Sequence, residues 1–327
     1  MKKACRAALP YVALFALALF QRAEAQIYQL AEMNTEEIAQ LDRSTSVVII
    51  PGGILEEHGP YLPSFSDGYM NQRLARALAD EIVERPGWSA VMFPQIPLGT
   101  GGANEIGRRY TYSGSYTVRM ATLRSVFMDI ATELGDQGFR WIFVVHIHGG
   151  SNHNRALDQA GDYFHDLYGG EMINLYGVAE GPTPNLRTEA EKSEDGISLH
   201  SGMDETSLIM FLRPDLVDPT VSEAPSFSAF SMEELVAIAR SEEWPGYFGS
   251  PRLASAAHGA QSWSAFEKMF VDLAIRILDG FDYRQLPRYT DIMGGLPEIP
   301  EIDRDALDRD AAILRQQQDW LAEAELE

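Results

Sequence analysis

The stretch SVVIIPGGILEEHGPYLPSFSD, residues 46–67, joins an apolar run to a group of polar side chains. Residues 46–55 are mostly apolar and β-branched, which predicts a buried strand. Glu56 and His58 follow, and they face the same crevice because residues two apart in an extended chain point to one side. Asp67 opens the next helical pattern, where its two carboxylate oxygens could bridge two cations. Alone, an E-x-H pair at a strand end is more often a plain polar loop edge than a pair of metal ligands.

Three more apolar runs predict buried strands, and helical patterns lie between them. The additional strands are predicted at residues 89–96, 141–147 and 172–176. The helices are predicted at residues 67–85, 118–134 and 154–167. Strands that alternate with amphipathic helices indicate a mostly parallel sheet covered by helices on both faces. Such sheets bind ligands beyond the C-terminal ends of their strands, so the polar residues at those ends are the candidates for function.

Residues 1–25 have the pattern of a signal peptide. Three basic residues precede an apolar run at residues 7–20, and AEA at residues 23–25 gives a small-x-small cleavage site before Gln26. A membrane anchor is the alternative, but a spanning helix needs roughly 20 apolar residues and this run is shorter. We therefore expect a protein exported to the periplasm or secreted, with no membrane attachment after cleavage and a hydrolase domain over residues 26–283.

Charge and cysteine content narrow the function further. Cleavage would remove Cys5, the single cysteine, so the mature chain would have neither a disulfide nor a Cys nucleophile. The net charge would change from −22 to −25, because the removed segment holds four basic residues and one acidic residue. A surface this acidic repels phosphate backbones, which argues against nucleic acid as a partner.

Two segments interrupt the strand and helix patterns. Residues 180–198 have little apolar content and predict a loop, either a mobile lid that leads into His200 or an ordinary surface excursion. Residues 284–300 are rich in Pro and Gly and predict a linker to a C-terminal helix at residues 301–327. The apolar stripe of that helix consists of Leu307, Ala311, Leu314 and Leu321. It packs against its own domain or, as we favour for a terminal element on a linker, against a neighbouring subunit.

A second polar group ends the predicted strand at residues 141–147. His146 and His148 share a face at the sheet edge where the E-x-H pair is expected, and two glycines follow that let a ligand approach the backbone closely. Imidazole and carboxylate groups together form common metal sites. An HGG turn also occurs in the oxyanion holes of esterases, but this chain lacks the G-x-S-x-G nucleophile elbow that those enzymes need.

A third polar group is HSGMDETS at residues 200–207. A helix is predicted to begin near Met203, which places Glu205 in its first turn and His200 in the turn before it. An imidazole at that position can transfer protons. The carboxylate is either a metal ligand or a residue that merely complements the helix dipole.

Together the three motifs resemble the creatininase family of amidohydrolases. The matching patterns are G-x-x-E-x-H-G-P-x-L-P-x-x-x-D at residues 53–67, H-G-G-x-N at 148–152 and H-[AS]-G-x-x-E-T-S at 200–207. Weaker matches are the glycine-rich segment 99–118 and the sequence GYFGSP at residues 246–251. Order and spacing match from about residue 47 to residue 259, most of the mature chain.

The resemblance implies a three-layer α/β/α sandwich with two divalent ions at the C-terminal edge of its sheet. It assigns Glu56, Asp67 and His148 to one ion. It assigns His58, Asp67 and a further carboxylate to the other, so that Asp67 bridges the two. His200 corresponds to the proton-transfer histidine of the family. Family members commonly form cyclic hexamers, which implies a homo-oligomer and suits the C-terminal helix as an interface element.

The chain departs from the creatininase pattern at several positions. Creatininase itself has a carboxylate two residues after the strand-end histidine, where this chain has Gly150, so Glu205 is predicted as the replacement ligand. Tyr61 replaces the second histidine of H-G-P-H, and His146 stands where Asn is common. Tyr61, His146 and Asn152 are predicted to lie behind the ligands or against the substrate. These changes argue against naming creatinine as the substrate.

The motifs therefore predict an exported metal-dependent amidohydrolase that cleaves a C–N bond of a small cyclic amide or formamide with water activated by two metal ions. Zn, Mn and Fe all suit carboxylate and imidazole ligands. Two alternatives stay open. One is a binding protein that keeps the fold and captures a metal or solute without turnover, which Tyr61 and Gly150 favour. The other is a lactonase that uses the same metal pair.

Overall fold

The computed structural model describes residues 26–178 and 185–326. The predicted signal peptide and the first five residues of the predicted loop at 180–198 lie outside the described residues. Within the described ranges, no helix is long and apolar enough to cross a membrane.

A five-stranded sheet with the order β1-β3-β2-β4-β5 forms the centre of the protein, and every pair of neighbouring strands is parallel. The strands are β1 (Ile27–Gln29), β2 (Ser46–Pro51), β3 (Ser89–Met92), β4 (Trp141–Val145) and β5 (Glu171–Asn174). Strands β2 and β4 are neighbours, and their register pairs Pro51 with Val145. The polar residues that follow these two strands therefore leave the sheet side by side.

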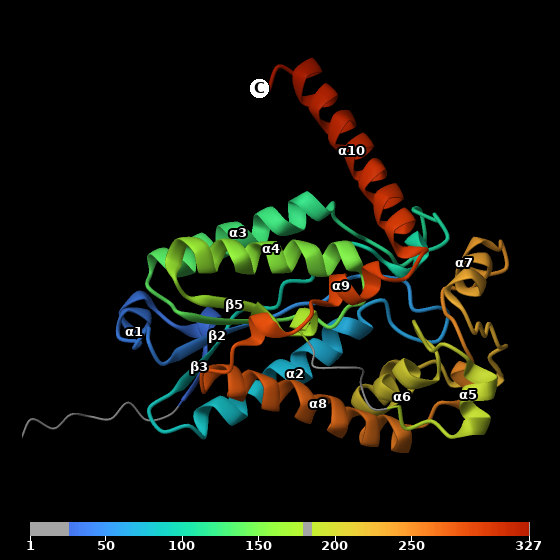
Figure 1. Cartoon of the computed structure of the whole chain (residues 1–327), viewed down its shortest axis with the longest axis horizontal. Helices are drawn as coiled ribbons and strands as arrows, with labels where there is room; N and C mark the ends of the chain where they lie inside the picture. The colour runs from blue at the N-terminus through green and yellow to red at the C-terminus, as the bar shows by residue number, and fades with distance from the viewer. Residues whose placement is uncertain (1–25, 179–184, 327) are drawn as a thin grey trace, which may run out of the picture.

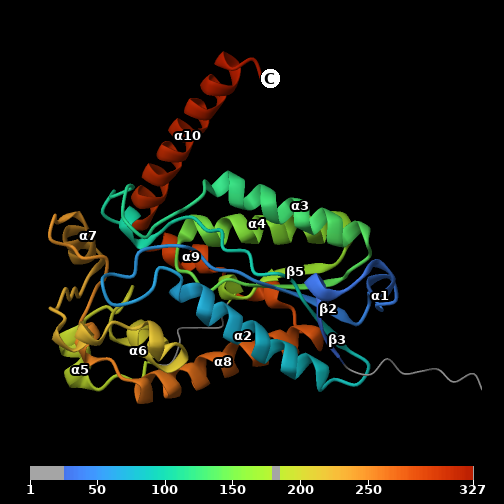
Figure 2. The ribbon, with the colours of Figure 1, turned by 180° about the vertical axis from the view of Figure 1, so that it is seen from behind.

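Helices cover both faces of the sheet (Figures 1 and 2), which confirms the predicted three-layer α/β/α sandwich. One face is covered by α3 (Met120–Asp136) and α4 (Ser151–Tyr168). The opposite face is covered by α2 (Ser66–Val83) and α8 (Ala256–Leu278), with α6 (Met203–Leu212) packed beside α8.

Strand β2 is buried on both sides, which explains its continuous apolar sequence. Val48 and Ile50 pack into the core beneath α3 and α4, whereas Val47 and Ile49 pack into the core beneath α2 and α8. This alternation follows from the two-residue period of an extended chain. Because both cores hold β2 in place, the residues at its C-terminal end are fixed in direction.

The remaining helices lie outside these layers. They are α1 (Thr35–Ala39), α5 (Glu189–Asp195), α7 (Met232–Arg240), α9 (Tyr289–Gly294) and α10 (Ile299–Glu323). The first half of α10 packs on the domain, and its second half projects away from it (Figure 1).

Two segments expected to be irregular contain helices. The prediction of a loop over residues 180–198 is wrong for α5, which begins with a capping box formed by Thr188 and Glu191. Asp195 at the end of α5 is fully buried, and its carboxylate accepts hydrogen bonds from the backbone of Met203 and Ser250. In the segment 284–300, predicted as a linker, α9 packs against α4.

Candidate metal centre

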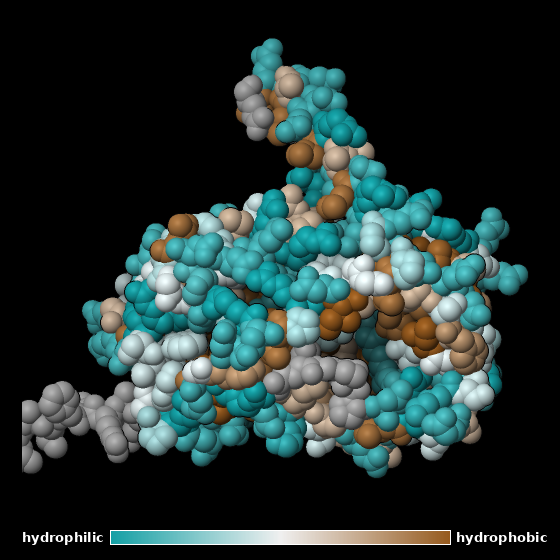
Figure 3. Space-filling view, in the orientation of Figure 1, coloured by the Kyte–Doolittle hydropathy of each residue, from teal (hydrophilic) through white to brown (hydrophobic). Residues whose placement is uncertain are grey.

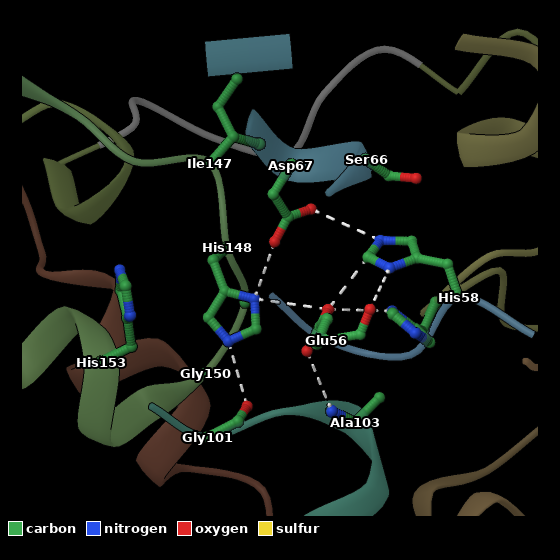
Figure 4. A network of polar contacts seen from close by, with 12 residues as sticks. Glu56, His58, Ser66, Asp67, Gly101, Ala103, Ile147, His148, Gly150 and His153 are labelled. Carbon is green, nitrogen blue, oxygen red and sulfur yellow. Dashed lines mark hydrogen bonds and ion pairs between the residues drawn. The ribbon is translucent and has the colours of Figure 1, made fainter. Parts of the chain in front are cut away.

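Five predicted ligands meet beyond the C-terminal edge of the sheet, and Figure 4 shows four of them, all except Glu205. Glu56 and His58 follow β2, and His148 follows β4. Asp67 is the second residue of α2, and Glu205 lies in the first turn of α6. The side chains of the first four are almost fully buried, and that of Glu205 is 19% exposed.

The first group consists of Glu56, Asp67 and His148, whose ligand atoms lie within 4.8 Å of one another. His148 Nδ1 is 3.6 Å from Glu56 Oε1 and 3.2 Å from Asp67 Oδ2. His148 Nε2 lies 3.0 Å from the carbonyl oxygen of Gly101 and donates to it, because a carbonyl can only accept. In the neutral imidazole, Nδ1 therefore turns its lone pair toward the two carboxylates.

The second group consists of His58, Asp67 and Glu205. His58 Nε2 is 3.6 Å from Asp67 Oδ1 and 3.3 Å from Glu205 Oε1. His58 Nδ1 lies 3.1 Å from the Glu56 carbonyl oxygen and donates to it, which leaves Nε2 free as a ligand atom. The two groups share Asp67, and each takes a different one of its carboxylate oxygens.

The donor set fits divalent metal ions. A lone pair on imidazole and a negative carboxylate repel each other unless a cation lies between them. Asp67 Oδ2 is buried, and a neutral His148 whose Nδ1 lies 3.2 Å away cannot donate to it, so this oxygen is available to a cation. Nitrogen and oxygen ligands in this combination are accepted by Zn, Mn and Fe.

The electric field in the site also favours a cation. Burial raises the pKa of Glu56 well above its usual range. Burial lowers the pKa of His148, but Glu56 and Asp67 outweigh that effect and raise the pKa to about 9. Burial likewise opposes protonation of His58, and the carboxylates of Glu205 and Asp67 hold its pKa well above the ordinary value. The negative carboxylates that raise the pKa values of these histidines would equally attract a metal ion.

His200 lies beside both groups, in the turn before α6. Its Nε2 donates to the Glu57 carbonyl at 2.5 Å, so Nδ1 faces Glu56 Oε1 at 3.3 Å and Glu205 Oε2 at 3.8 Å. Burial and the nearby His58 lower the pKa of His200 to about 4, which keeps the ring neutral near pH 7. The ligand atoms of Glu56, His58 and His200 also lie within 4.8 Å of one another, so His200 is close enough to bind a metal itself.

Packing explains why Glu205 rather than residue 150 approaches the site. A Cβ atom on Gly150 would lie 2.8 Å from His148 Nε2 and 2.8 Å from the Gly101 carbonyl oxygen, so no side chain fits there. Glu205 is oriented from α6 by the Ser201 N–H, which donates to its Oε2 at 2.6 Å. Ser201 has φ 51, a strained left-handed conformation for a non-glycine residue, which aims that N–H at Glu205.

The three predicted supporting residues have different positions. Asn152 lies at the cavity and donates to the Asp303 carbonyl at 3.1 Å, so it fixes the C-terminal segment. His146 is buried behind His148, with its Nδ1 3.2 Å from Nε2 of His153, and it does not reach the cavity. Tyr61 packs its ring against Tyr247 and does not reach the cavity either. Of the two positions predicted for these residues, behind the ligands or against the substrate, His146 and Tyr61 line no part of this cavity, and their roles stay predictions.

The metal-binding groups open into a cavity of ≈ 280 Å³, and Figure 3 shows the molecule hollowed between the base of α10 and α6. Sequence reasoning missed two parts of its wall. One is Glu105, whose signal in the sequence is a carboxylate within the glycine-rich segment 99–118. The other is the C-terminal segment, which contributes Tyr289, Met293 and Ile302 among others. No local sequence signal shows that this segment returns to the site.

A parallel α/β/α sandwich with carboxylates and imidazoles grouped at its C-terminal edge defines a metal-dependent hydrolase. The model of one such family, creatininase, described as creatinine amidohydrolase, matches residues 31–274. This match spans more than half of the chain, and the chain belongs to the creatininase family, as the motifs predicted.

Curated relatives include two proteins named mycofactocin precursor peptide peptidase. The one from Mycolicibacterium smegmatis is 27% identical over 238 residues, which cover 69% of this chain and 83% of the relative. The one from Mycobacterium ulcerans is 24% identical over 264 residues, which cover 76% of this chain and 91% of the relative.

Solved structures of creatininases share the fold. A structure titled creatininase Mn has a TM-score of 0.58 at 20% identity, with 77% of this chain and 98% of that chain covered. A creatininase mutant of Zn-Zn type has a TM-score of 0.57 at 20% identity, with 76% and 97% covered. A putative creatinine amidohydrolase from Bacteroides fragilis has a TM-score of 0.54 at 22% identity, with 77% and 95% covered. These titles describe manganese and zinc forms of the neighbours, not of this chain.

Proposed function

We propose that this creatininase-family amidohydrolase cleaves a C–N bond of a small cyclic amide or formamide, with two divalent ions held on either side of Asp67. The observation that carries the proposal is the sharing of Asp67 between two groups of three ligands, with one carboxylate oxygen turned to each. Both groups face one cavity, so a substrate carbonyl would reach them together.

Divalent ions in these positions would lower the pKa of a shared water and polarise the amide carbonyl. The protein itself supplies orientation and proton transfer. His200 is held by the Glu57 carbonyl through Nε2, so its Nδ1 can take a proton from the attacking water and return it to the departing nitrogen. Hydrolysis of this kind needs neither a Ser nor a Cys nucleophile, which agrees with the motifs that the chain lacks.

The size of the cavity supports a small substrate. A volume of ≈ 280 Å³ lies at the lower end of the range for small-molecule sites, and the C-terminal segment forms one of its walls. A peptide substrate is the second candidate, because both curated relatives are named as peptidases of a precursor peptide. For a peptide, a short terminal segment would be the part that fits this cavity.

A substrate panel tests the proposal. The protein, loaded with Zn or Mn, is assayed with cyclic amides, formamides, lactones and short peptides, and metal content is measured on the same sample. Turnover of amides or formamides with two metal equivalents per chain is the expected result. Turnover of lactones alone, or of peptides alone, would contradict the amide and formamide proposal and assign the protein to that substrate class instead. Binding of zero or one metal equivalent with no hydrolysis would identify a binding protein and overturn the proposal.

Export to the periplasm or the medium is part of the proposal and rests on residues 1–25 alone. Fractionation of cells that express the full chain, with N-terminal sequencing of the product, tests it. We expect the protein outside the cytoplasm with Gln26 as its first residue. An uncleaved product in the cytoplasm would contradict this expectation.

We also propose that the protein forms a homo-oligomer through α10. The second half of this helix projects from the domain and exposes apolar side chains, of which Leu314 is 37% and Trp320 is 61% exposed. Light scattering of the full chain and of a chain ending at residue 310 measures the contribution of the helix. We expect the shorter chain to have the smaller assembly, and equal masses would contradict the proposal.

A further inference from the structure

Three carboxylates face the cavity apart from the metal-binding groups. Two of them are neutralised by cations of the protein. Asp204 lies 3.3 Å from Nε of Arg187, and Asp303 lies 3.1 Å from a guanidinium nitrogen of Arg155. Glu105 is the exception, since no described residue forms an ion pair or a side-chain hydrogen bond with its carboxylate.

Glu105 is held next to the metal centre by its own segment. It ends the short 3-10 helix Ala103–Glu105, and the N–H of Ala103 donates to Glu56 Oε2 at 3.2 Å (Figure 4). Glu105 is 7% exposed. A carboxylate buried to this degree without a partner is costly when ionised, so its presence at a ligand cavity calls for a partner from outside the protein.

The charges around Glu105 do not supply that partner. Burial raises its pKa to about 7, although Arg309 acts in the opposite direction. The guanidinium of Arg309 lies over the ring of Tyr110, 4.9 Å from its centroid, and forms no ion pair with Glu105. Among the described residues that line the cavity there is no Lys and no Arg. Among the described residues, the cavity therefore offers the unpaired carboxylate of Glu105 and neither a Lys nor an Arg for a substrate carboxylate.

Apolar side chains complete the wall near this carboxylate. Ile106 follows Glu105 directly, and Met293 and Ile302 come from α9 and α10. The base of α10 is fixed beside them, because Arg108 forms ion pairs with Glu301 and Asp305. A ligand with a flat or apolar body and a cationic nitrogen group at one end would satisfy both features at once.

We propose that Glu105 is the specificity-determining residue for a cationic nitrogen group of the substrate, an ammonium, amidinium or guanidinium. The cation pairs with the Glu105 carboxylate, and the apolar wall formed by Ile106, Met293 and Ile302 contacts the rest of the molecule. This inference rests on the proposed function, because it takes the cavity to be the substrate site of that function. Its evidence is the unpaired buried carboxylate and the composition of the cavity wall.

Binding of an isosteric pair of probes tests the inference without an assay of turnover. Benzamidinium and benzamide have nearly the same shape, and the first carries a positive charge. At pH 8 the metal-loaded protein is expected to bind benzamidinium about tenfold or more tightly than benzamide by calorimetry, since charge-assisted hydrogen bonds are strong.

Two variants separate Glu105 from a general attraction of the acidic cavity for cations. Glu105→Gln should reduce the preference for benzamidinium to within about twofold. Asp303→Asn is the matched control, because it removes a cavity carboxylate that already has a partner, and it should keep the preference. Equal binding of the two probes by the native protein, or a preference that survives Glu105→Gln, would overturn the inference. Failure to hydrolyse any amide would instead count against the proposed function, because the binding measurement does not depend on turnover.

Discussion

Asp67 has the most demanding position in the site, because its two oxygens face different imidazoles. Burial alone would raise its pKa, yet the contacts with His148 and His58 hold the pKa below the ordinary value. Its place in the first turn of α2 adds the positive end of a helix dipole, which also favours the ionised form. The side chain is thus kept as a carboxylate in a position where either oxygen can bind a cation.

Replacement of this bridge should remove metal and activity together. We expect Asp67→Ala to lower activity at least 1000-fold. A loss of this size corresponds to about 4 kcal/mol of transition-state stabilisation. Metal content measured by mass spectrometry should fall at the same time. Asp80→Ala is the control on the same helix, because Asp80 is exposed and pairs with Arg76 at 2.8 Å. Full activity of Asp67→Ala, or full retention of both ions, would contradict the assignment.

His200 allows a test that separates proton transfer from metal binding. If it moves a proton, His200→Gln should keep the metal content and lower kcat by roughly 100- to 10,000-fold. Loss of metal in this variant would instead assign it as a ligand, which the distance of its Nδ1 from Glu56 also permits. His165→Gln is the control, since His165 lies beside Glu171 in the last turn of α4, at the opposite end of that helix from His148. Its activity should stay within about twofold of the native value.

At the scale of elements, the apolar and helical patterns in the sequence were sufficient to predict the strands and helices of the central layers. The helix predicted from residue 67 begins at Ser66, and the strand predicted from residue 46 begins at Ser46. Each predicted strand continues past the end of the observed strand, because its apolar run extends into the segment that follows. The E-x-H pair and His148 could be placed at one sheet edge because parallel strands end together.

Other elements could not be predicted because their signals are weak or depend on distant contacts. Strand β1 has three residues and lies at the sheet edge, so it lacks a long apolar run. Glu205 meets His58 only through the packing of α6 on α8, and motif resemblance alone suggested it. The C-terminal wall of the cavity is held by contacts between residues far apart in the chain, such as the hydrogen bond from Tyr289 to the Gly149 carbonyl, that no periodicity encodes.

Asp158, a buried carboxyl between α4 and β5, should make the stability of the folded protein depend on pH. Burial raises the pKa of Asp158 to about 7, and its Oδ2 has no hydrogen-bond partner. Folding then favours the protonated form, so the stability contributed by this group is complete below pH 4 and is lost as the pH rises through 7. Between pH 5 and pH 8 the native protein should lose about 2–3 kcal/mol through this group.

Asp158→Asn should remove that loss, because the amide stays neutral and can still accept from Asn174 Nδ2, now 3.2 Å from Asp158 Oδ1. Urea unfolding at pH 5 and pH 8 measures the difference, with the exposed Asp166→Asn on the same helix as control. The difference between the two pH values should be smaller in Asp158→Asn than in either other protein. Identical pH dependence in all three would exclude a neutral buried Asp158.

For the whole molecule, the metal centre is a place where carboxylates from several elements repel one another. Glu56, Asp67 and Glu205 come from three different parts of the chain and bring negative charge into one buried volume. The chain carries a net charge of −22, so the surrounding surface does not relieve this repulsion. A bound cation would link the end of β2 to α2 and α6 and neutralise the cluster.

Metal removal should therefore destabilise the entire fold and not the cavity alone. A ligand present at about 1000 times its Kd stabilises the folded state by about 4 kcal/mol, which corresponds to roughly 5–10 °C in Tm for a domain of this size. We expect the melting temperature to fall by that amount with a chelator and to recover with Zn or Mn. The same experiment on Asp67→Ala should show little response to either treatment, because its metal site is broken. If the native protein melts at the same temperature with and without metal, the ions contribute nothing to the folded state and the buried carboxylates must be neutralised by protons instead.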